Sequence, residues 1–275
     1  MSDQTPPTVH IVANGFQDAW YKAVKECMKY GAFKKREYGK PVNTKVIISL
    51  IEINNPLQEQ MLHPDFPTKE LHLGEYIKQF ERGYDWKKQG FEYSYIDRLI
   101  NYPTTDIFSR DDGYFKVDRK PYTKSIDQIK IIRDNIYERI KKGGECLVSN
   151  RDQAVTWVPE RDAFVKEDQP CLQRVQFFIY SFPEIRGDTI IPGKGEFHVS
   201  WRSRDLYAAW NSNMVALTRF FNKEVFEPNN IKIIRCIDFS SSLHIYEGDW
   251  ETAEKVKPPN VNLYSSKLVY EEGLY

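Results

Sequence analysis

The irregular order of helical and strand patterns is the feature of this sequence that most limits its fold. Helical spacing in residues 16–31, "FQDAWYKAVKECMKYG", precedes a β-branched run in residues 44–53, "TKVIISLIEI". Later strand patterns follow one another without an intervening helix, as in "QAVTWV" (153–158), "LQRVQFFIYSF" (172–182) and "GEFHVSWRS" (195–203). A doubly wound parallel sheet requires strands and helices to alternate, so the sequence predicts an α+β fold instead.

Apolar spacing also predicts which side chains face the core. In the first helix it places Cys27 among the apolar residues. In the last of the three strand patterns, alternation sends Phe197, Val199 and Trp201 to one side. Cys27 is therefore expected in the core, and the three strand residues are expected to share one face, opposite His198, Ser200 and Arg202.

Two more helices are predicted before residue 145. In "KELHLGEYIKQFERG" (69–83), Tyr76 belongs to an apolar stripe at helical spacing. Ser125 precedes a run of isoleucines that repeat at intervals of three and four residues. We therefore expect Ser125 to be the N-cap of that helix.

The charge balance of the chain limits its partners. The 275 residues include 39 basic and 39 acidic side chains, so the formal net charge is zero. Nonspecific nucleic-acid binding needs an excess of lysine and arginine, so we expect no nucleic-acid partner. A small anionic ligand is still allowed, because it needs only a few arginines in one place.

Composition further predicts a single cytoplasmic domain. No segment approaches the roughly 20 apolar residues that span a bilayer, and the N-terminus has no apolar signal core, so we expect no membrane partner. Candidate linkers are short, which favours one domain over residues 1–275. The cysteines lie far apart and the histidines are scattered, so neither a disulfide framework nor a metal site is expected. Glycine-rich nucleotide-binding motifs are absent from the sequence.

One cysteine stands directly before a strongly apolar strand pattern. Cys171, in "QPCLQRVQFFIY" (169–180), fits either a packing role or a nucleophile. A nucleophile must be a thiolate, and neighbouring guanidinium groups favour that form. Strand alternation directs Arg174 away from Cys171, so Arg202 is the better candidate for the neighbouring cation.

Asn213 lies where a helix is expected to be apolar. It stands three residues after Trp210 and four before Leu217, so it shares or borders the apolar stripe. A buried amide without partners costs about 1–3 kcal/mol. Its partner is therefore either the backbone or a flat ligand with an adjacent donor and acceptor.

Four motifs occur in order in the second half of the chain. They are "SNRDQAVTW", "PCLQRVQF", "RSRDLYAAWNSN" and "HIY", and together they span roughly residues 149–246. This set resembles the thymidylate synthase family, in which a proline–cysteine nucleophile precedes a Gln–aromatic strand. The segment "RSRDLYAAW" is most similar to archaeal members, whereas the N-terminal third matches much less clearly.

The resemblance implies a fold and a reaction. The family has a large mixed β-sheet flanked by helices, and its members form homodimers through that sheet. Its reaction transfers a one-carbon unit from 5,10-methylene-tetrahydrofolate or a related tetrahydropterin to C5 of a pyrimidine nucleotide. The resemblance therefore implies that Cys171 attacks C6 of the base as a thiolate and that dUMP becomes dTMP.

The resemblance also implies roles for the other site residues. Arg202 and Ser203 would hold the 5′-phosphate, with Arg202 also favouring the thiolate. Asn213 would read the edge of uracil, and Tyr95 would help to remove the C5 proton. The other implied contacts are the pterin ring for Asp205, the sugar 3′-hydroxyl for His244 and Tyr246, the phosphate in the partner subunit for Arg151, and a phosphate loop for Arg36.

Some positions depart from the family pattern. Asn150 stands where one of two adjacent arginines is common, Leu172 replaces a histidine, and Ser242 replaces an acidic residue. The family's catalytic glutamate has two candidates, Glu70 and Glu75, and spacing does not choose between them.

Two alternatives to dUMP methylation are therefore open. A (d)CMP or dUMP 5-hydroxymethylase of the same family shares the early covalent steps, and an asparagine amide can turn to suit cytosine. A nucleotide-binding protein that has lost turnover would keep the pocket without the reaction.

Overall fold

The computed structural model describes most of the chain. The described residues are 5–38, 40–58, 60–68, 70–91, 93–104, 107–111, 114–117, 124–143, 149–164 and 169–259. The side chains of Arg36 and Glu70, both candidates from the sequence, lie outside the described part.

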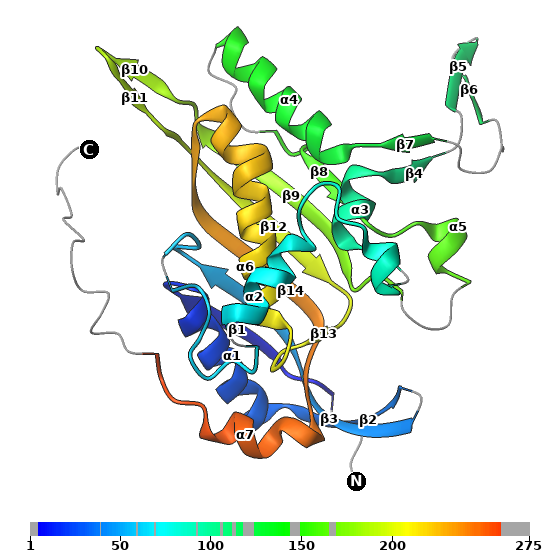
Figure 1. The fold of residues 1–275 in the computed structure, drawn as a ribbon, viewed down its shortest axis with the longest axis vertical. Coiled ribbons are helices and arrows are strands. Elements are labelled where there is room, and N and C mark those ends of the chain that lie inside the picture. The colour runs from blue at the N-terminus through cyan, green and yellow to red at the C-terminus, as the bar shows by residue number, and fades with distance from the viewer. Residues whose placement is uncertain are drawn as a thin grey trace.

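An eight-stranded mixed sheet forms the centre of the fold (Figure 1). Its strands are β1 (Thr8–Ala13), β2 (Ala32–Tyr38), β3 (Lys40–Ile53), β8 (Gln153–Val155), β9 (Leu172–Ser181), β12 (Gly193–Trp201), β13 (Arg204–Asp205) and β14 (Ile231–Tyr246). The main path runs β1-β3-β14-β12-β9-β8, while β2 pairs with β3 and β13 pairs with β14. The pairs β1/β3 and β12/β14 are parallel, whereas β3/β14, β9/β12 and β8/β9 are antiparallel. The predicted α+β class is therefore confirmed, with a large mixed sheet.

Helices surround this sheet. They are α1 (Phe16–Tyr30), α2 (Glu70–Lys78), α3 (Tyr95–Ile100), α4 (Gln128–Lys142), α5 (Pro159–Asp162), α6 (Trp210–Phe221) and α7 (Trp250–Lys255), with short turns η1 (Trp86–Gln89), η2 (Asn222–Phe226), η3 (Glu227–Asn229) and η4 (Glu247–Asp249). In Figure 1, α6 lies across the middle of the sheet and α2 lies against α6. Within the described residues, no helix combines the length and the apolar character that crossing a membrane would require.

Three small two-stranded sheets lie outside the main one. Their strands are β4 (Tyr102–Thr104) with β7 (Lys124–Ile126), β5 (Ile107–Asp111) with β6 (Tyr114–Val117), and β10 (Glu184–Arg186) with β11 (Thr189–Ile191). The β4/β7 pair brings the chain from α3 back to the start of α4 (Figure 1).

Side-chain alternation gives the main sheet two different faces. On the face that we call the covered face, Phe177 and Phe197 pack edge-on against Phe221 of α6, with ring centroids 5.1 and 5.2 Å apart. On the opposite face, which we call the open face, Phe178 is half-buried and Phe239 is 39% exposed. The apolar core of the chain therefore lies on the covered face.

Most of the sequence predictions for the core are confirmed, but one helix cap is wrong. Cys27, which was predicted to lie in the core, is buried. Phe197, Val199 and Trp201, which were predicted to share one face, are all buried on the covered face. Ser125, the expected N-cap of α4, instead lies in β7 opposite Pro103. Asp127 caps the helix, because it directly precedes α4 and its carboxylate accepts a hydrogen bond from the backbone N–H of Lys130 at 2.8 Å.

A β-bulge in β14 changes the direction of its last side chains. Between Ser240 and Leu243, the pairing with β3 skips two residues of β14 but only one of β3. The extra residue keeps Ser240 and Leu243 on the covered face and turns His244 and Tyr246 to the other side. The bulge therefore decides where the late His-x-Tyr motif points.

Candidate active site

Cys171 lies one residue before β9, next to the point where Arg202 follows β12. The thiol is half-buried. The Arg202 guanidinium donates to the carbonyl oxygens of Gln169 and Pro170 at 2.6 and 3.1 Å, and its backbone N–H donates to the carbonyl oxygen of Cys171 at 3.0 Å. Arg174, in contrast, pairs with Ser200 and is exposed. The cation beside the cysteine turn is therefore Arg202 rather than Arg174.

The other described cysteines are buried in the core. Burial raises the pKa of Cys27 to about 12 and the pKa of Cys236 well above its usual value. A buried thiol of this kind is chemically inert. Among the described cysteines, Cys171 alone is partly accessible to solvent.

Two tyrosines lie beside Cys171. Tyr95 begins α3, and its ring packs edge-on against Trp201 at a centroid distance of 5.5 Å. The hydroxyl oxygens of Tyr93 and Tyr95 are 3.5 Å apart. Burial raises the pKa of Tyr93 to about 12 and the pKa of Tyr95 well above its usual value, and the nearby Cys171 adds to both increases. Both phenols are therefore neutral at physiological pH.

A third tyrosine is the partner of Asn213. The amide of Asn213 is buried on α6, and its Nδ2 atom donates to the hydroxyl of Tyr76 on α2 at 2.5 Å. This contact is neither the backbone bond nor the ligand that the sequence left open. Burial raises the pKa of Tyr76, which is close enough to Tyr93 and Tyr95 to affect their charges. Tyr76, which contacts Asn213, therefore lies near the two tyrosines beside the cysteine.

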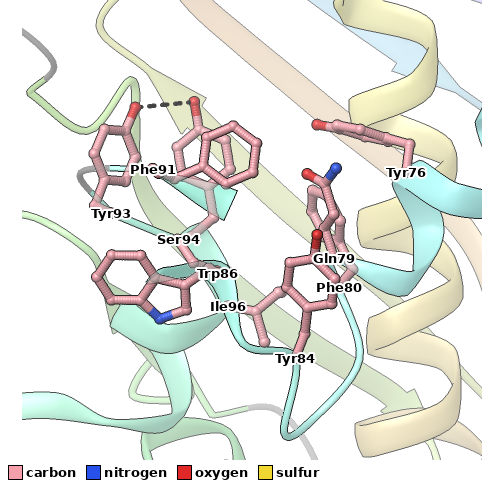
Figure 2. A pocket seen from close by; sticks show the side chains of 11 residues that line it. Tyr76, Gln79, Phe80, Tyr84, Trp86, Phe91, Tyr93, Ser94 and Ile96 are labelled. Carbon is pink, nitrogen blue, oxygen red and sulfur yellow. Dashed lines mark hydrogen bonds between the residues drawn. The ribbon is translucent and has the colours of Figure 1, made fainter. Parts of the chain in front are cut away.

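A pocket of about 380 Å³ opens beside these tyrosines (Figure 2). Its walls come from one continuous segment that runs from α2 through η1 to α3. The lining residues are Tyr76, Gln79, Phe80, Tyr84, Trp86, Gly90, Phe91, Tyr93, Ser94, Tyr95 and Ile96. None of these residues carries a formal charge, and most are aromatic. Such walls suit a flat, uncharged ring.

A buried ion pair lies on the core side of the tyrosines. Arg204 donates to Asp238 at 2.6 Å, and its guanidinium carbon lies 3.7 Å from the ring centroid of Trp201. Burial lowers the pKa of Arg204 and raises the pKa of Asp238, although each partner opposes the shift. Arg204 also interacts electrostatically with Tyr76 and Tyr95. A cation therefore supports the pocket wall from behind.

The segment that joins β12 to β13 connects the cysteine to the His-x-Tyr motif. Arg202 contacts the turn at Cys171, and three residues later Asp205 pairs in register with His244 of β14. Ser203 lies between them, half-buried. Residues of three separate sequence motifs therefore lie at the same end of neighbouring strands of the sheet.

The His-x-Tyr motif lies beside β13, where Asp205 pairs with His244. Tyr246 is the last residue of β14. The carboxylate of Asp205 accepts a hydrogen bond from the backbone N–H of Ala208 at 3.0 Å, and burial raises the pKa of Asp205. The ring centroids of His244 and Tyr246 are 4.9 Å apart, and Nδ1 of His244 lies 3.4 Å from the carbonyl oxygen of Ser242. Ser242 therefore contacts His244 through its backbone carbonyl oxygen.

Arg151 lies away from Cys171 of the same chain. It precedes β8, which runs antiparallel to β9 and pairs Gln153 with Gln176. The amide of Gln176 donates to the carbonyl oxygen of Asn150 at 3.0 Å. Five residues of β9 separate this contact from Cys171, which is about 16 Å along a strand. The exposed Arg151 thus lies far from the cysteine turn of its own chain.

Among the described side chains, the hydrogen-bond partner of Asn213 is Tyr76 and not a glutamate. The side chain of Glu70 lies outside the described residues, as does that of Arg36. Glu75 is described and exposed on α2. The side chain of α2 that reaches Asn213 belongs to the next residue, Tyr76.

The sequence analysis missed Tyr76 and Tyr93 as site residues. Tyr93 stands two residues before Tyr95, so it was visible as the neighbour of a chosen residue. The sequence also assigns Tyr76 to an apolar stripe, which is correct for its ring. Spacing carries no signal for the hydroxyl contact, because Asn213 is 137 residues away.

Comparisons with known proteins extend over most of the chain. No protein-family model matches it. Curated archaeal relatives that carry the name "Putative thymidylate synthase" are 26% identical in Methanosarcina acetivorans and 27% identical in Methanococcoides burtonii, each over 250 residues that cover 90% of this chain and 93% of the relative. A relative of the same name in Methanothermobacter thermautotrophicus is 25% identical over 257 residues, covering 90% of this chain and 97% of the relative.

The comparisons and the motifs agree. The aligned region includes the part of the chain in which the cysteine, arginine, asparagine and His-x-Tyr motifs occur in order. By sequence, this chain is similar to archaeal proteins that carry the name "Putative thymidylate synthase".

Proposed function

We propose that this protein transfers a one-carbon unit to C5 of a pyrimidine nucleotide and that it converts dUMP to dTMP. The observation that carries the proposal is the line of groups from Arg202 through Cys171 and the tyrosines to Asn213. It provides an anion-binding group, a nucleophile and an amide that can read a base edge. Transfer of a one-carbon unit to C5 of a nucleoside monophosphate requires all three groups.

The proposed roles follow from the chemistry of each group. Cys171 attacks C6 of the base and makes C5 a carbon nucleophile. Arg202 and Ser203 bind the 5′-phosphate. Asn213 reads O4 and N3 of uracil, and Tyr95 takes the proton from C5. The further contacts are the pterin ring for Asp205, the sugar 3′-hydroxyl for His244 and Tyr246, and the phosphate for Arg36.

The proposed cosubstrate is 5,10-methylene-tetrahydrofolate or a related tetrahydropterin. The aromatic pocket supports this choice, because its uncharged walls fit a flat ring system and it adjoins Tyr95. A ring bound there would carry its one-carbon unit next to the base that Cys171 holds.

The proposed functional unit is a homodimer of one-domain chains that pair through their open faces. Val12 and Phe239 are 48% and 39% exposed on that face, which is more than a buried sheet would leave. Arg151 supports the same arrangement. It lies about 16 Å or more along the sheet from the Cys171 of its own chain, so its proposed phosphate is the one bound by a partner subunit.

Cytosine nucleotides are the second candidate substrate. The Asn213 amide presents the same donor and acceptor in either rotation, and the Tyr76 hydroxyl can accept from one rotation or donate to the other. This contact therefore allows uracil or cytosine. With cytosine, the expected product is 5-hydroxymethyl-dCMP.

Release of tritium from C5 of dUMP tests the proposal. We expect release with the unaltered protein, and dihydropterin formation when the methylene-tetrahydropterin is added. Cys171→Ser should abolish release and leave dUMP affinity within about twofold, whereas the core variant Cys27→Ser should release tritium normally. Binding of dUMP without release would identify a binding protein, and formation of 5-hydroxymethyl-dCMP from added dCMP and the methylene-tetrahydropterin, without dihydropterin, would identify the hydroxymethylase.

A further inference from the structure

Tyr93 is placed where it can act through Tyr95. Its hydroxyl oxygen lies 3.5 Å from that of Tyr95, and the two rings meet edge-on at 5.4 Å (Figure 2). Tyr93 also contacts the backbone of Cys171 and lies within the field of Arg202. It is half-buried and lines the pocket, so one side of the phenol faces the space that a ligand and water can enter.

A neutral phenol needs such a neighbour in order to accept a proton. Tyr95 is half-buried, packs against Trp201 and remains protonated at physiological pH. A protonated phenol oxygen can take a new proton only if it gives its own proton away in the same event. Among the described residues, Tyr93 provides the hydroxyl that is hydrogen-bonded to Tyr95. Each of the two oxygens can donate to the other.

We infer that Tyr93 is a positioning residue that relays the proton removed from C5, from Tyr95 to water in the pocket. The inference rests on the proposed function, because it concerns the C5 proton of the bound pyrimidine. It adds a second tyrosine to the step that Tyr95 begins.

The step balances without another reactant. The C5–H bond breaks, and its electron pair stays on the ring as the enolate of the Cys171 adduct. Tyr95 gains the C5 proton as its own hydroxyl proton moves to Tyr93, and the original proton of Tyr93 passes to a water molecule. Both phenols end neutral, and the net change is the transfer of one proton from C5 to water.

Tyr93→Phe tests this relay, because phenylalanine keeps the ring packing and removes only the hydroxyl. We expect tritium release from C5 of dUMP to slow at least ~10-fold, with dUMP affinity within about twofold by calorimetry. The double variant with Tyr95→Phe should release tritium no more slowly than Tyr95→Phe alone, because the two hydroxyls act in one step. Tyr102→Phe is the matched control, since it loses a hydroxyl that donates to the carbonyl oxygen of Trp157 at 2.8 Å, and it should release tritium normally.

The pH profile separates a relay from a packing role. The defect of Tyr93→Phe should shrink as pH rises, because hydroxide can then accept the proton of Tyr95 directly. Normal release by Tyr93→Phe, a defect that does not change with pH, or a loss of dUMP affinity would each overturn the relay and leave the proposed function standing. Absence of release from both dUMP and dCMP with the unaltered protein would overturn the relay and the proposed function together.

Discussion

The two faces of the main sheet each bury a carboxylate that is paired with arginine, but the two pairs have different surroundings. On the covered face, Arg204 and Asp238 are at most 2% exposed and lie 2.6 Å apart. On the open face, Glu196 is 1% exposed at the same distance from Arg235, but that arginine is 40% exposed. In the Arg204–Asp238 pair both side chains are buried, whereas in the Arg235–Glu196 pair the arginine is in contact with solvent.

This difference reverses the effect on the carboxyl group. Burial dominates at Asp238 and raises its pKa, even with Arg204 beside it. Burial also opposes the charge on Glu196, but hydrogen bonds from His198, Arg235 and Tyr180 outweigh it and hold the pKa of Glu196 at about 2. Asp238 also accepts hydrogen bonds from Arg204 and Trp210, so the number of donors does not separate the two carboxylates. The difference is that the Asp238 pair is sealed from solvent, whereas the Glu196 pair reaches solvent through Arg235.

The largest expected effect tests whether a second copy covers the open face. Phe239→Arg would place a charge at the interface twice in a symmetric dimer. We expect the dimer dissociation constant to rise at least ~1000-fold, about 4 kcal/mol, as measured by analytical ultracentrifugation. Ile131→Arg is the control, because Ile131 is 50% exposed on α4 rather than on the sheet. A Phe239→Arg protein that dimerises normally would mean that the open face is in contact with solvent.

The same substitution on each face gives the next largest effect. Arg204→Met leaves Asp238 buried without its cation, so we expect a loss of about 3–4 kcal/mol in the free energy of unfolding. Arg235→Met should lose only about 1 kcal/mol, because Arg235 is half-exposed and Glu196 keeps Tyr180 and His198. Urea unfolding of both variants measures the two values, and equal losses would remove the distinction between the faces.

Acid should partly repair the Arg204→Met variant. The folded-state pKa of Asp238 is raised above its unfolded value, so the neutral form contributes stability that is present at low pH and lost as pH rises through the folded pKa. Without Arg204 this effect is larger, because the neutral donors that remain, Trp210 and Ser240, offset burial less than a cation does. The stability of Arg204→Met should therefore rise toward that of the unaltered protein as pH falls from about 7 to about 4.

The elements of the fold could be predicted because their signals are local. Alternation with a period of two places Phe197, Val199 and Trp201 on one face without knowledge of any other strand. The order of strands could not be predicted in this way, since it depends on contacts between distant segments. The bulge in β14 is a clear case, because one extra residue relative to β3 turns His244 to the other face of the sheet. No local sequence pattern in β14 predicts this bulge.

The candidate site divides in the same manner. Motif order brought Cys171 and Arg202 to attention, and their backbones are hydrogen-bonded to each other in the structure. The contact between Tyr76 and Asn213 joins two helices that are 137 residues apart, and it depends on a hydroxyl at the end of an otherwise apolar side chain. Sequence periodicity predicts that the ring of Tyr76 faces the core, but it does not predict the partner of the hydroxyl group.

Glu196→Gln should have an intermediate effect with the opposite acid response. The folded pKa of Glu196, about 2, lies below its unfolded value, so its charge contributes stability that is present above the unfolded pKa and lost as pH falls toward 2. At pH 7 we expect the variant to lose about 2–3 kcal/mol, measured by urea unfolding. In acid the unaltered protein should fall toward the variant, whereas Arg204→Met rises toward the unaltered protein. A deficit at pH 3 that is as large as the deficit at pH 7 would contradict this account.

His10→Gln should have the smallest effect and should show how far the open-face network acts as a unit. Nε2 of His10 lies 2.6 Å from Glu52, and Glu52 lies 3.8 Å from Arg235, which bonds Glu196. His10 is 55% exposed, so solvent screens its pair and we expect a loss within about 0.5 kcal/mol. A double-mutant cycle of His10→Gln with Glu196→Gln should be additive within about 0.5 kcal/mol. Stronger coupling would mean that the side chains from β1 to β12 act as one network. A second copy that covers the open face would produce such coupling.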